Sequence, residues 1–235
     1  MPNEIKVLST TAMKTSLDEL APEFERATGS KLMCSFGPSA RIAKMVADGE
    51  AHDVAIVTDQ GHEALTAQGK LVPGVRADVA KSAMALAVQK GAARPDISTA
   101  QKFKETLLAA KSLGMSNPIG GGQSGANLAK IFDELGITEA MKAKSVYGPG
   151  GPAGLIGHFL VRKEVEIGIQ QLPELMAVPG IDIVGPLPAE IQLMTVFSAG
   201  LSTSATNADA GRALITFLTT PKAAAVIRSK GMETG

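Results

Sequence analysis

The stretch Ile5-Lys6-Val7-Leu8-Ser9-Thr10-Thr11, residues 5–11, decides how the chain is interpreted. Its first four residues are typical of a β-strand, and three hydroxyl side chains follow where that strand ends. Leu17, Leu20 and Phe24 then recur at helical spacing, and Gly29 is placed to end the helix. The sequence therefore begins with a predicted strand, a hydroxyl-rich turn and a helix.

The same order is repeated along the chain. Strands are predicted at residues 31–36, 53–57, 84–88, 113–116, 146–147, 165–169, 181–184 and 195–197. Helices are predicted between most of these strands, and two more, at 208–218 and 222–229, close the chain. Alternation of this kind indicates an α/β protein with mainly parallel sheets flanked by helices.

The strands fall into two sets, which predicts two lobes. We assign residues 1–83 and 195–235 to lobe 1 and residues 84–194 to lobe 2, with two crossing hinge strands near 84–89 and 194–198. A ligand would occupy the cleft between the lobes, where strand carboxyl ends and helix N-termini converge.

Composition excludes several classes of function. With 23 basic and 23 acidic residues, seven Phe, one Tyr and no Trp, the chain has neither the basic surface nor the aromatic platforms that nucleic-acid binding requires. The single cysteine, Cys34, excludes an internal disulfide and a cysteine-rich zinc site, and we expect it to be a small buried apolar residue. His52, His62 and His158 lack metal-ligand spacing and are expected at the surface, so no metal is predicted.

The sequence also bears on the membrane and on location. No run of about 18 apolar residues occurs, so no insertion into a membrane is expected. The chain enters its first strand at once, without the basic and apolar regions of a signal peptide. We therefore expect either a cytosolic protein or a secreted one whose leader has been removed.

Four turns attract attention because each follows a predicted strand and opens a helix: residues 9–11, 37–39, 120–125 and 148–151. They are rich in hydroxyl groups or glycine and carry no fixed charge. Free N–H groups at helix N-termini bind anions, and Ser and Thr hydroxyls add further donors. Each turn alone is explained by helix capping and turn formation, but four at one edge favour a shared small anionic ligand.

Other polar residues join these turns as candidates. Arg41 opens a helix, and Arg76 follows a turn near the lobe boundary; either one pairs with a ligand carboxylate or is structural. Two amides, Gln170 and Gln171, follow a predicted strand and offer both donors and acceptors, or cap the next helix. The predicted ligand-binding residues are Ser9, Thr10, Thr11, Ser39, Arg41, Thr58, Arg76, Ser116, Gly122, Ser124, Gly150, Gln170 and Gln171.

Two motifs approach enzyme signatures but are incomplete. Gly120-x-Gly122-x-x-Gly125 has the spacing of a dinucleotide-binding turn, yet no acidic residue ends the next strand. Gly122-x-Ser124-x-Ala126 lacks the final glycine of a nucleophile elbow. No cofactor is predicted, and the sequence identifies no catalytic residue.

At this point the sequence resembles the molybdate-type periplasmic solute-binding proteins of ABC transporters, which have the type II periplasmic-binding fold. The resemblance covers nearly the whole chain and lies in the order and spacing of several segments. They are residues 8–14 (LSTTAMK), 36–40 (FGPSA), 52–56 (HDVAI), 122–125 (GQSG), 164–169 (EVEIGI) and the closing helix at 221–231.

The resemblance implies a two-lobed protein that binds an oxyanion or an organic carboxylate and delivers it to the membrane subunits of a transporter. It implies that Ser9 or Thr10, together with Ser39, holds the anion, and that backbone donors come from residues 122–125 and 148–151. It also implies a periplasmic location. Molybdate binders of the family usually have a tyrosine after the strand that matches residues 165–169. In this chain the matching position is at about Gln171. We expect a monomer.

A sister group that contains aconitate isomerase resembles the chain at least as well, including the Gln-Gln pair and residues 178–180 (VPG). This resemblance implies an alternative activity, the interconversion of cis and trans tricarboxylates by proton transfer. The carboxylates would be anchored by Arg41, Arg76, Ser9, Ser39 and Ser124. Asp59 and His158 are candidates for the general base, which the sequence does not identify. A third hypothesis is a cytosolic anion sensor or scavenger.

Overall fold

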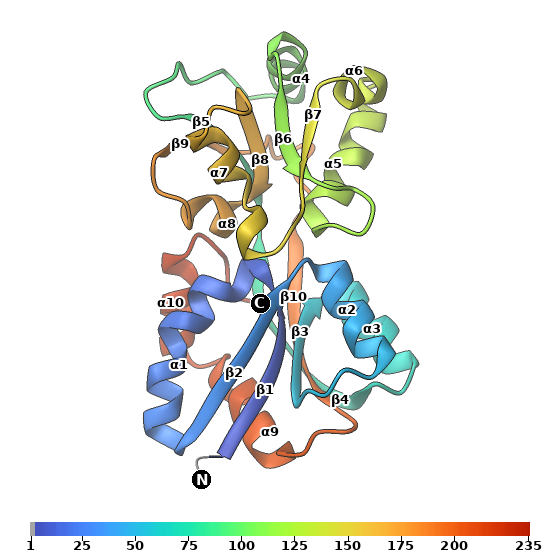
Figure 1. The fold of residues 1–235 in the computed structure, drawn as a ribbon, viewed down its shortest axis with the longest axis vertical. Coiled ribbons are helices and arrows are strands. Elements are labelled where there is room, and N and C mark those ends of the chain that lie inside the picture. The colour runs from blue at the N-terminus through green and yellow to red at the C-terminus, as the bar shows by residue number, and fades with distance from the viewer. Residues whose placement is uncertain (1–2) are drawn as a thin grey trace. The chain divides into compact units, whose positions relative to one another are not determined.

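The computed structural model describes residues 3–235 and divides into two compact units. Unit 1 comprises the chain up to Ser82 together with Thr195–Gly235, and unit 2 is Ala83–Met194. Met1 and Pro2, at the start of the predicted lobe 1, lie outside the described residues. Each unit is a five-stranded sheet with helices on both faces (Figure 1), which confirms the predicted α/β fold class.

In unit 1 the strands have the order β2-β1-β3-β10-β4. They are β1 (Asn3–Thr10), β2 (Ser30–Gly37), β3 (Val54–Thr58), β4 (Leu71–Ser82) and β10 (Thr195–Ser202). The first three pair in parallel, whereas β10 is antiparallel to both of its neighbours. Four of the five strands therefore run in one direction, and the carboxyl ends of β1, β2 and β3 meet at one edge.

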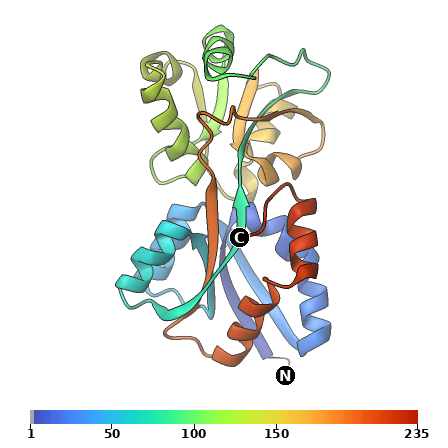
Figure 2. The ribbon, with the colours of Figure 1, turned by 180° about the vertical axis from the view of Figure 1, so that it is seen from behind.

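The helices of unit 1 cover both faces of this sheet. They are α1 (Lys14–Thr28), α2 (Ser39–Asp48), α3 (Asp59–Ala67), α9 (Ala208–Phe217) and α10 (Pro221–Ser229), and a short 3-10 helix at Thr11–Met13 precedes α1. Ile5 and Val7 face α1, α9 and α10, while Leu8 faces α2 and α3. This alternation follows from the two-residue period of a strand. Figure 2 shows the red C-terminal helix α10 beside the blue α1.

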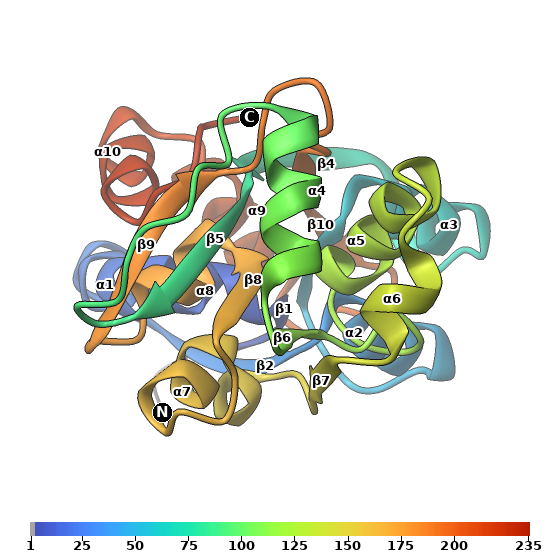
Figure 3. The same cartoon turned by 90° about the horizontal axis from the view of Figure 1, so that it is seen from above.

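Unit 2 repeats this plan with the strand order β7-β6-β8-β5-β9. Its strands are β5 (Met84–Gln89), β6 (Leu113–Ser116), β7 (Ser145–Gly148), β8 (Ile167–Gln171) and β9 (Ile181–Pro186). Its helices are α4 (Ala100–Ala109), α5 (Gln123–Glu134), α6 (Thr138–Lys142), α7 (Ile156–Val161) and α8 (Leu172–Met176), with a 3-10 turn at Pro152–Gly154. Figure 3 shows α4 next to α5 and α6, with α7 and α8 away from them.

Three details of the fold differ from the sequence predictions. Strand β4 was not predicted, because Pro73, Gly74 and alternating polar residues give it little strand character. It is an edge strand, the position in a sheet where a proline is tolerated. The short α6 was also missed, and α3 begins at Asp59, four residues before the predicted helix.

The predicted surface position of two histidines is wrong. His52 and His62 are both buried. The ring of His62 packs on β10, where a Cβ at Gly200 would come within 2.5 Å of its Nε2 atom. Cys34 is half-buried, and burial raises the pKa of its thiol to about 11.

The return of the chain to unit 1 depends on a buried carboxylate. Asp53, just before β3, is 1% exposed. Its side chain accepts hydrogen bonds from the backbone N–H of Lys6 (2.9 Å), Thr206 (2.8 Å) and Asn207 (2.9 Å), and from the Thr206 hydroxyl (3.1 Å). These contacts join the first strand to the segment that enters α9.

Replacing this carboxylate provides a test of the fold. We expect Asp53→Ala to lower the free energy of unfolding by roughly 3 kcal/mol or more, because several buried N–H donors lose their acceptor. Asp48→Ala is the matched control, since Asp48 makes only an exposed ion pair with Lys44 and its loss should cost about 1 kcal/mol or less. Urea unfolding measures both changes, and equal losses in the two variants would contradict the prediction.

Candidate functional site

Four hydroxyl residues form what we call the hydroxyl cluster of unit 1: Ser9, Thr10, Thr11 and Ser39. They lie where β1 ends and where α2 begins, and all four are at most 6% exposed. The hydroxyls of Thr10 and Ser39 are 2.9 Å apart, and the Ser9 hydroxyl donates to the Thr10 carbonyl at 3.2 Å. The structure thus brings together residues that are 29 positions apart in the sequence.

The backbone explains why these groups converge. β1 and β2 are parallel and in register up to Thr10 and Gly37, so both strands end at the same level. Pro38 then precedes α2 in an extended conformation and offers no side-chain cap. The first N–H groups of α2 are consequently left without a side-chain cap, as at helix starts that bind anions.

The hydroxyl cluster has hydrogen-bonding capacity that the described residues do not use. The Thr11 side-chain oxygen is buried and has no hydrogen-bond partner among them. Arg41, the third residue of α2, is exposed and makes no ion pair in the described part of the chain. A small anion would find hydroxyl and backbone donors here, with one free cation close by in the sequence.

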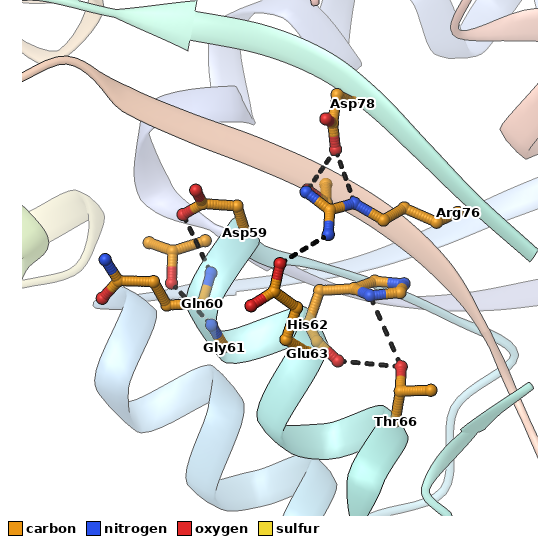
Figure 4. Close-up of polar contacts among 10 residues, drawn as sticks. Asp59, Gln60, Gly61, His62, Glu63, Thr66, Arg76 and Asp78 are labelled. Atoms are coloured by element: carbon orange, nitrogen blue, oxygen red, sulfur yellow. Dashed lines mark hydrogen bonds and ion pairs between the residues drawn. The ribbon is translucent and has the colours of Figure 1, made fainter. Parts of the chain in front are cut away.

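Thr58 and Asp59 lie at the end of β3 and have local roles. The Thr58 hydroxyl accepts a hydrogen bond from the Gly61 N–H at 3.2 Å and so caps α3. The Asp59 carboxylate accepts the N–H of Gln60 at 2.8 Å. Figure 4 shows both contacts in the first turn of α3. The structure therefore shows that Thr58 caps a helix. Its role in binding a ligand stays a prediction.

The second predicted arginine, Arg76, is already engaged by carboxylates. It lies within β4, not after a turn, and β10 and β3 separate it from β1. Its guanidinium donates to Asp78 at 2.8 Å and to Glu63 at 3.1 Å (Figure 4). The hydrogen bond from Arg76 lowers the pKa of Asp78, and burial together with Arg76 lowers the pKa of His62.

Unit 2 carries a second donor set, which we call the glycine turn: residues 116–125. Ser116 ends β6 and Ser124 lies in the first turn of α5, and their hydroxyls are 3.2 Å apart and buried. Gly122 is the N-cap of α5 and supplies no side-chain acceptor. Glycine is required at 125, because a Cβ there would come within 2.3 Å of the Ser116 carbonyl oxygen.

The remaining candidates are Gly150, Gln170 and Gln171. Gly150 lies in the loop after β7 with a positive φ of 76°, a conformation that favours glycine. The Gln170 side-chain oxygen accepts the N–H of Ile156 at 2.8 Å, so this amide holds the start of α7. Gln171 is 3% exposed and ends the strand.

Glu174 is a titratable group at this strand end that the sequence analysis did not select. It is the third residue of α8 and follows Gln171, the N-cap of that helix. Its side chain is half-buried, and desolvation raises the pKa of its carboxyl to about 8, although the Gln171 N–H opposes that rise by hydrogen bonding to the carboxylate. The sequence signal was a Glu three residues after an N-cap, the position of a capping box.

His158, the other predicted base, lies on α7 and is half-buried. Within residues 3–235 no group of three or more His, Cys, Asp or Glu side chains is arranged to hold a metal ion. No helix in the same range is long and apolar enough to cross a membrane.

Comparison of the sequence with protein families identifies the class of protein. The sequence matches the model of the family described as bacterial extracellular solute-binding protein over residues 5–233. The chain belongs to this family, which confirms the resemblance to solute-binding proteins noted in the sequence.

Two characterised relatives align over nearly the whole chain. Aconitate isomerase from Pseudomonas sp. is 35% identical, with 97% of this chain and 87% of the relative aligned. The molybdate-binding protein ModA from Azotobacter vinelandii is 27% identical, with 97% and 89% aligned. A solved structure, the periplasmic molybdate-binding protein of Azotobacter vinelandii, superposes with a TM-score of 0.80 at 21% identity, covering 98% of this chain and 99% of that one.

Proposed function

We propose that this protein binds a small anion, either an oxyanion or an organic carboxylate, as the solute-binding component of an ABC-type transporter. The observation that carries the proposal is the hydroxyl cluster of unit 1, in which buried neutral donors meet the uncapped start of α2. Membership of the solute-binding family and a relative named as molybdate-binding support it. The same membership supports a periplasmic location and membrane transporter subunits as partners.

Neutral hydrogen-bond donors are well suited to binding a small anion. A dianion held by several hydroxyl and N–H groups is stabilised by charge-assisted hydrogen bonds without the cost of burying an ion pair. The cluster consists of hydroxyl residues only, so no carboxylate within it would repel the ligand. The glycine turn of unit 2 offers donors of the same kind, at the uncapped start of α5.

Ligand class is tested first by thermal unfolding with molybdate, tungstate, sulfate, phosphate, citrate, cis-aconitate and trans-aconitate. We expect at least one of these anions to stabilise the protein, by about 2.7 kcal/mol at 100 times its Kd. A shift confined to molybdate or tungstate indicates an oxyanion binder, and a shift confined to the tricarboxylates indicates an organic-acid protein. The absence of any shift, confirmed by calorimetry, would contradict the proposal.

The hydroxyl cluster is tested by Ser39→Ala, measured with the anion that the panel identifies. Removing this hydroxyl should weaken binding by roughly 1–3 kcal/mol, or about 5- to 150-fold in Kd. Ser35→Ala is the matched control, because Ser35 is an exposed residue of the preceding strand β2. Unchanged affinity in Ser39→Ala would remove Ser39 from the site.

A second candidate function is an isomerase of the aconitate type, and the 35% identity to a protein of that name favours it. In such a reaction a base takes a proton from the methylene carbon, the double bond moves by one carbon, and a proton returns to the former vinyl carbon. The atoms balance without a cofactor. Asp59 and His158 stay the candidates for the base, and Glu174, whose pKa is raised by desolvation, is a third.

Turnover decides between the two functions. If the chain is an isomerase, a substoichiometric amount of protein converts cis-aconitate to trans-aconitate, and a buffer sample corrects for spontaneous conversion. Proton NMR in D2O follows both isomers and reveals deuterium that enters the product during proton transfer. Binding of cis-aconitate without any turnover would leave the protein as a binder and exclude the isomerase.

A further inference from the structure

Glu174 stands at the end of the central strand of unit 2, in a place prepared for a ligand and not for an ion pair. β8 lies between β6 and β5, and Met115 of β6 is level with Ile169 of β8. Ser116 therefore ends its strand level with Gln170, and Gln171 follows one residue later. The polar ends of two neighbouring strands meet here, and Glu174 is held one turn further on.

The backbone fixes the position of this carboxyl group. Gln171 is the N-cap of α8, and its N–H donates to the Glu174 side chain. Pro173 occupies the first turn of α8, where its missing N–H costs nothing and its fixed φ favours the helix start. Glu174 is thus tied back to the end of β8.

The surroundings provide no compensating cation. The elements packed against α8 are α7, β5, β8 and β9. Their ionisable side chains are His158 on α7 and Asp182 on β9, and β5 and β8 carry none. Asp182 is engaged with the N–H of Gly91 at 2.8 Å. Burial therefore acts on Glu174 largely unopposed, and only the Gln171 N–H favours its ionised form.

We propose that Glu174 is the proton-linked group of the anion site, and that the protein binds its anion together with one proton held on this carboxyl group. The inference rests on the proposed function. When protonated, the carboxyl is a neutral hydrogen-bond donor beside Gln171, and it joins the other neutral donors. When ionised, it places a negative charge among them and opposes the ligand.

The expected pH dependence follows from the pKa of about 8. Between pH 7 and pH 9 the protonated fraction of the free protein falls by about a factor of ten, so the apparent Kd should rise about tenfold. The direction is opposite to that of a site where a carboxylate must be ionised to act. Deprotonation of His158 also weakens anion binding, but its ordinary pKa puts that change near pH 6.5, below this window.

Isothermal titration calorimetry tests the proposal with an anion from the panel that stays fully ionised above pH 7, such as molybdate or trans-aconitate. At pH 8.5, titrations in two buffers of different ionisation enthalpy should reveal an uptake of about three quarters of a proton for each anion bound. Glu174→Gln should bind the anion with an affinity that no longer changes between pH 7 and pH 9. Glu164→Gln, an exposed glutamate paired with Arg162, is the control and should keep the wild-type profile.

The outcomes are separable. Anion binding with a constant Kd from pH 7 to pH 9 and no proton uptake would overturn the role of Glu174 and leave the proposed function intact. A tenfold change that persists in Glu174→Gln would also overturn it and would assign the proton to another group. If no anion binds the wild-type protein at either pH, the proposed function itself fails. If Glu174→Gln does not fold, proton uptake by the wild-type protein still decides the question.

Discussion

The Asp53 carboxylate is the constraint on which unit 1 depends. Its acceptor oxygens link Lys6 of β1 to Thr206 and Asn207, which lie 153 and 154 residues after Asp53 in the chain. Between these points the chain builds all of unit 2 and then returns to insert β10 between β3 and β4. Closing so long a loop costs conformational entropy, and several hydrogen bonds to one buried charge help to offset that cost.

The same carboxylate also stabilises the helix that follows. Asn207 is the N-cap of α9 and makes no side-chain cap of its own. The Asp53 carboxylate accepts the N–H of Asn207 and so lies at the N-terminus of the helix, where the helix dipole favours an anion. With α9 fixed, the face of the sheet opposite α2 is covered.

Sequence reasoning succeeded where local chemistry and strand periodicity agree. Ser9, Thr10 and Ser39 could be placed at one sheet edge because parallel strands end at the same level, and the structure joins Thr10 to Ser39. It did not reveal β4, whose strand character comes from pairing with β10 and not from its own residues. Nor could it show the carboxylates that engage Arg76, since that network joins different elements of unit 1 (Figure 4).

The environment of Glu174 is another feature that the sequence could not predict. Its position after an N-cap was visible in the sequence, but its burial depends on how α7, β5, β8 and β9 pack around a five-residue helix. The packing partly desolvates the carboxyl group and raises its pKa. Both donor sets are built from neutral groups, so an anion encounters no fixed negative charge within them.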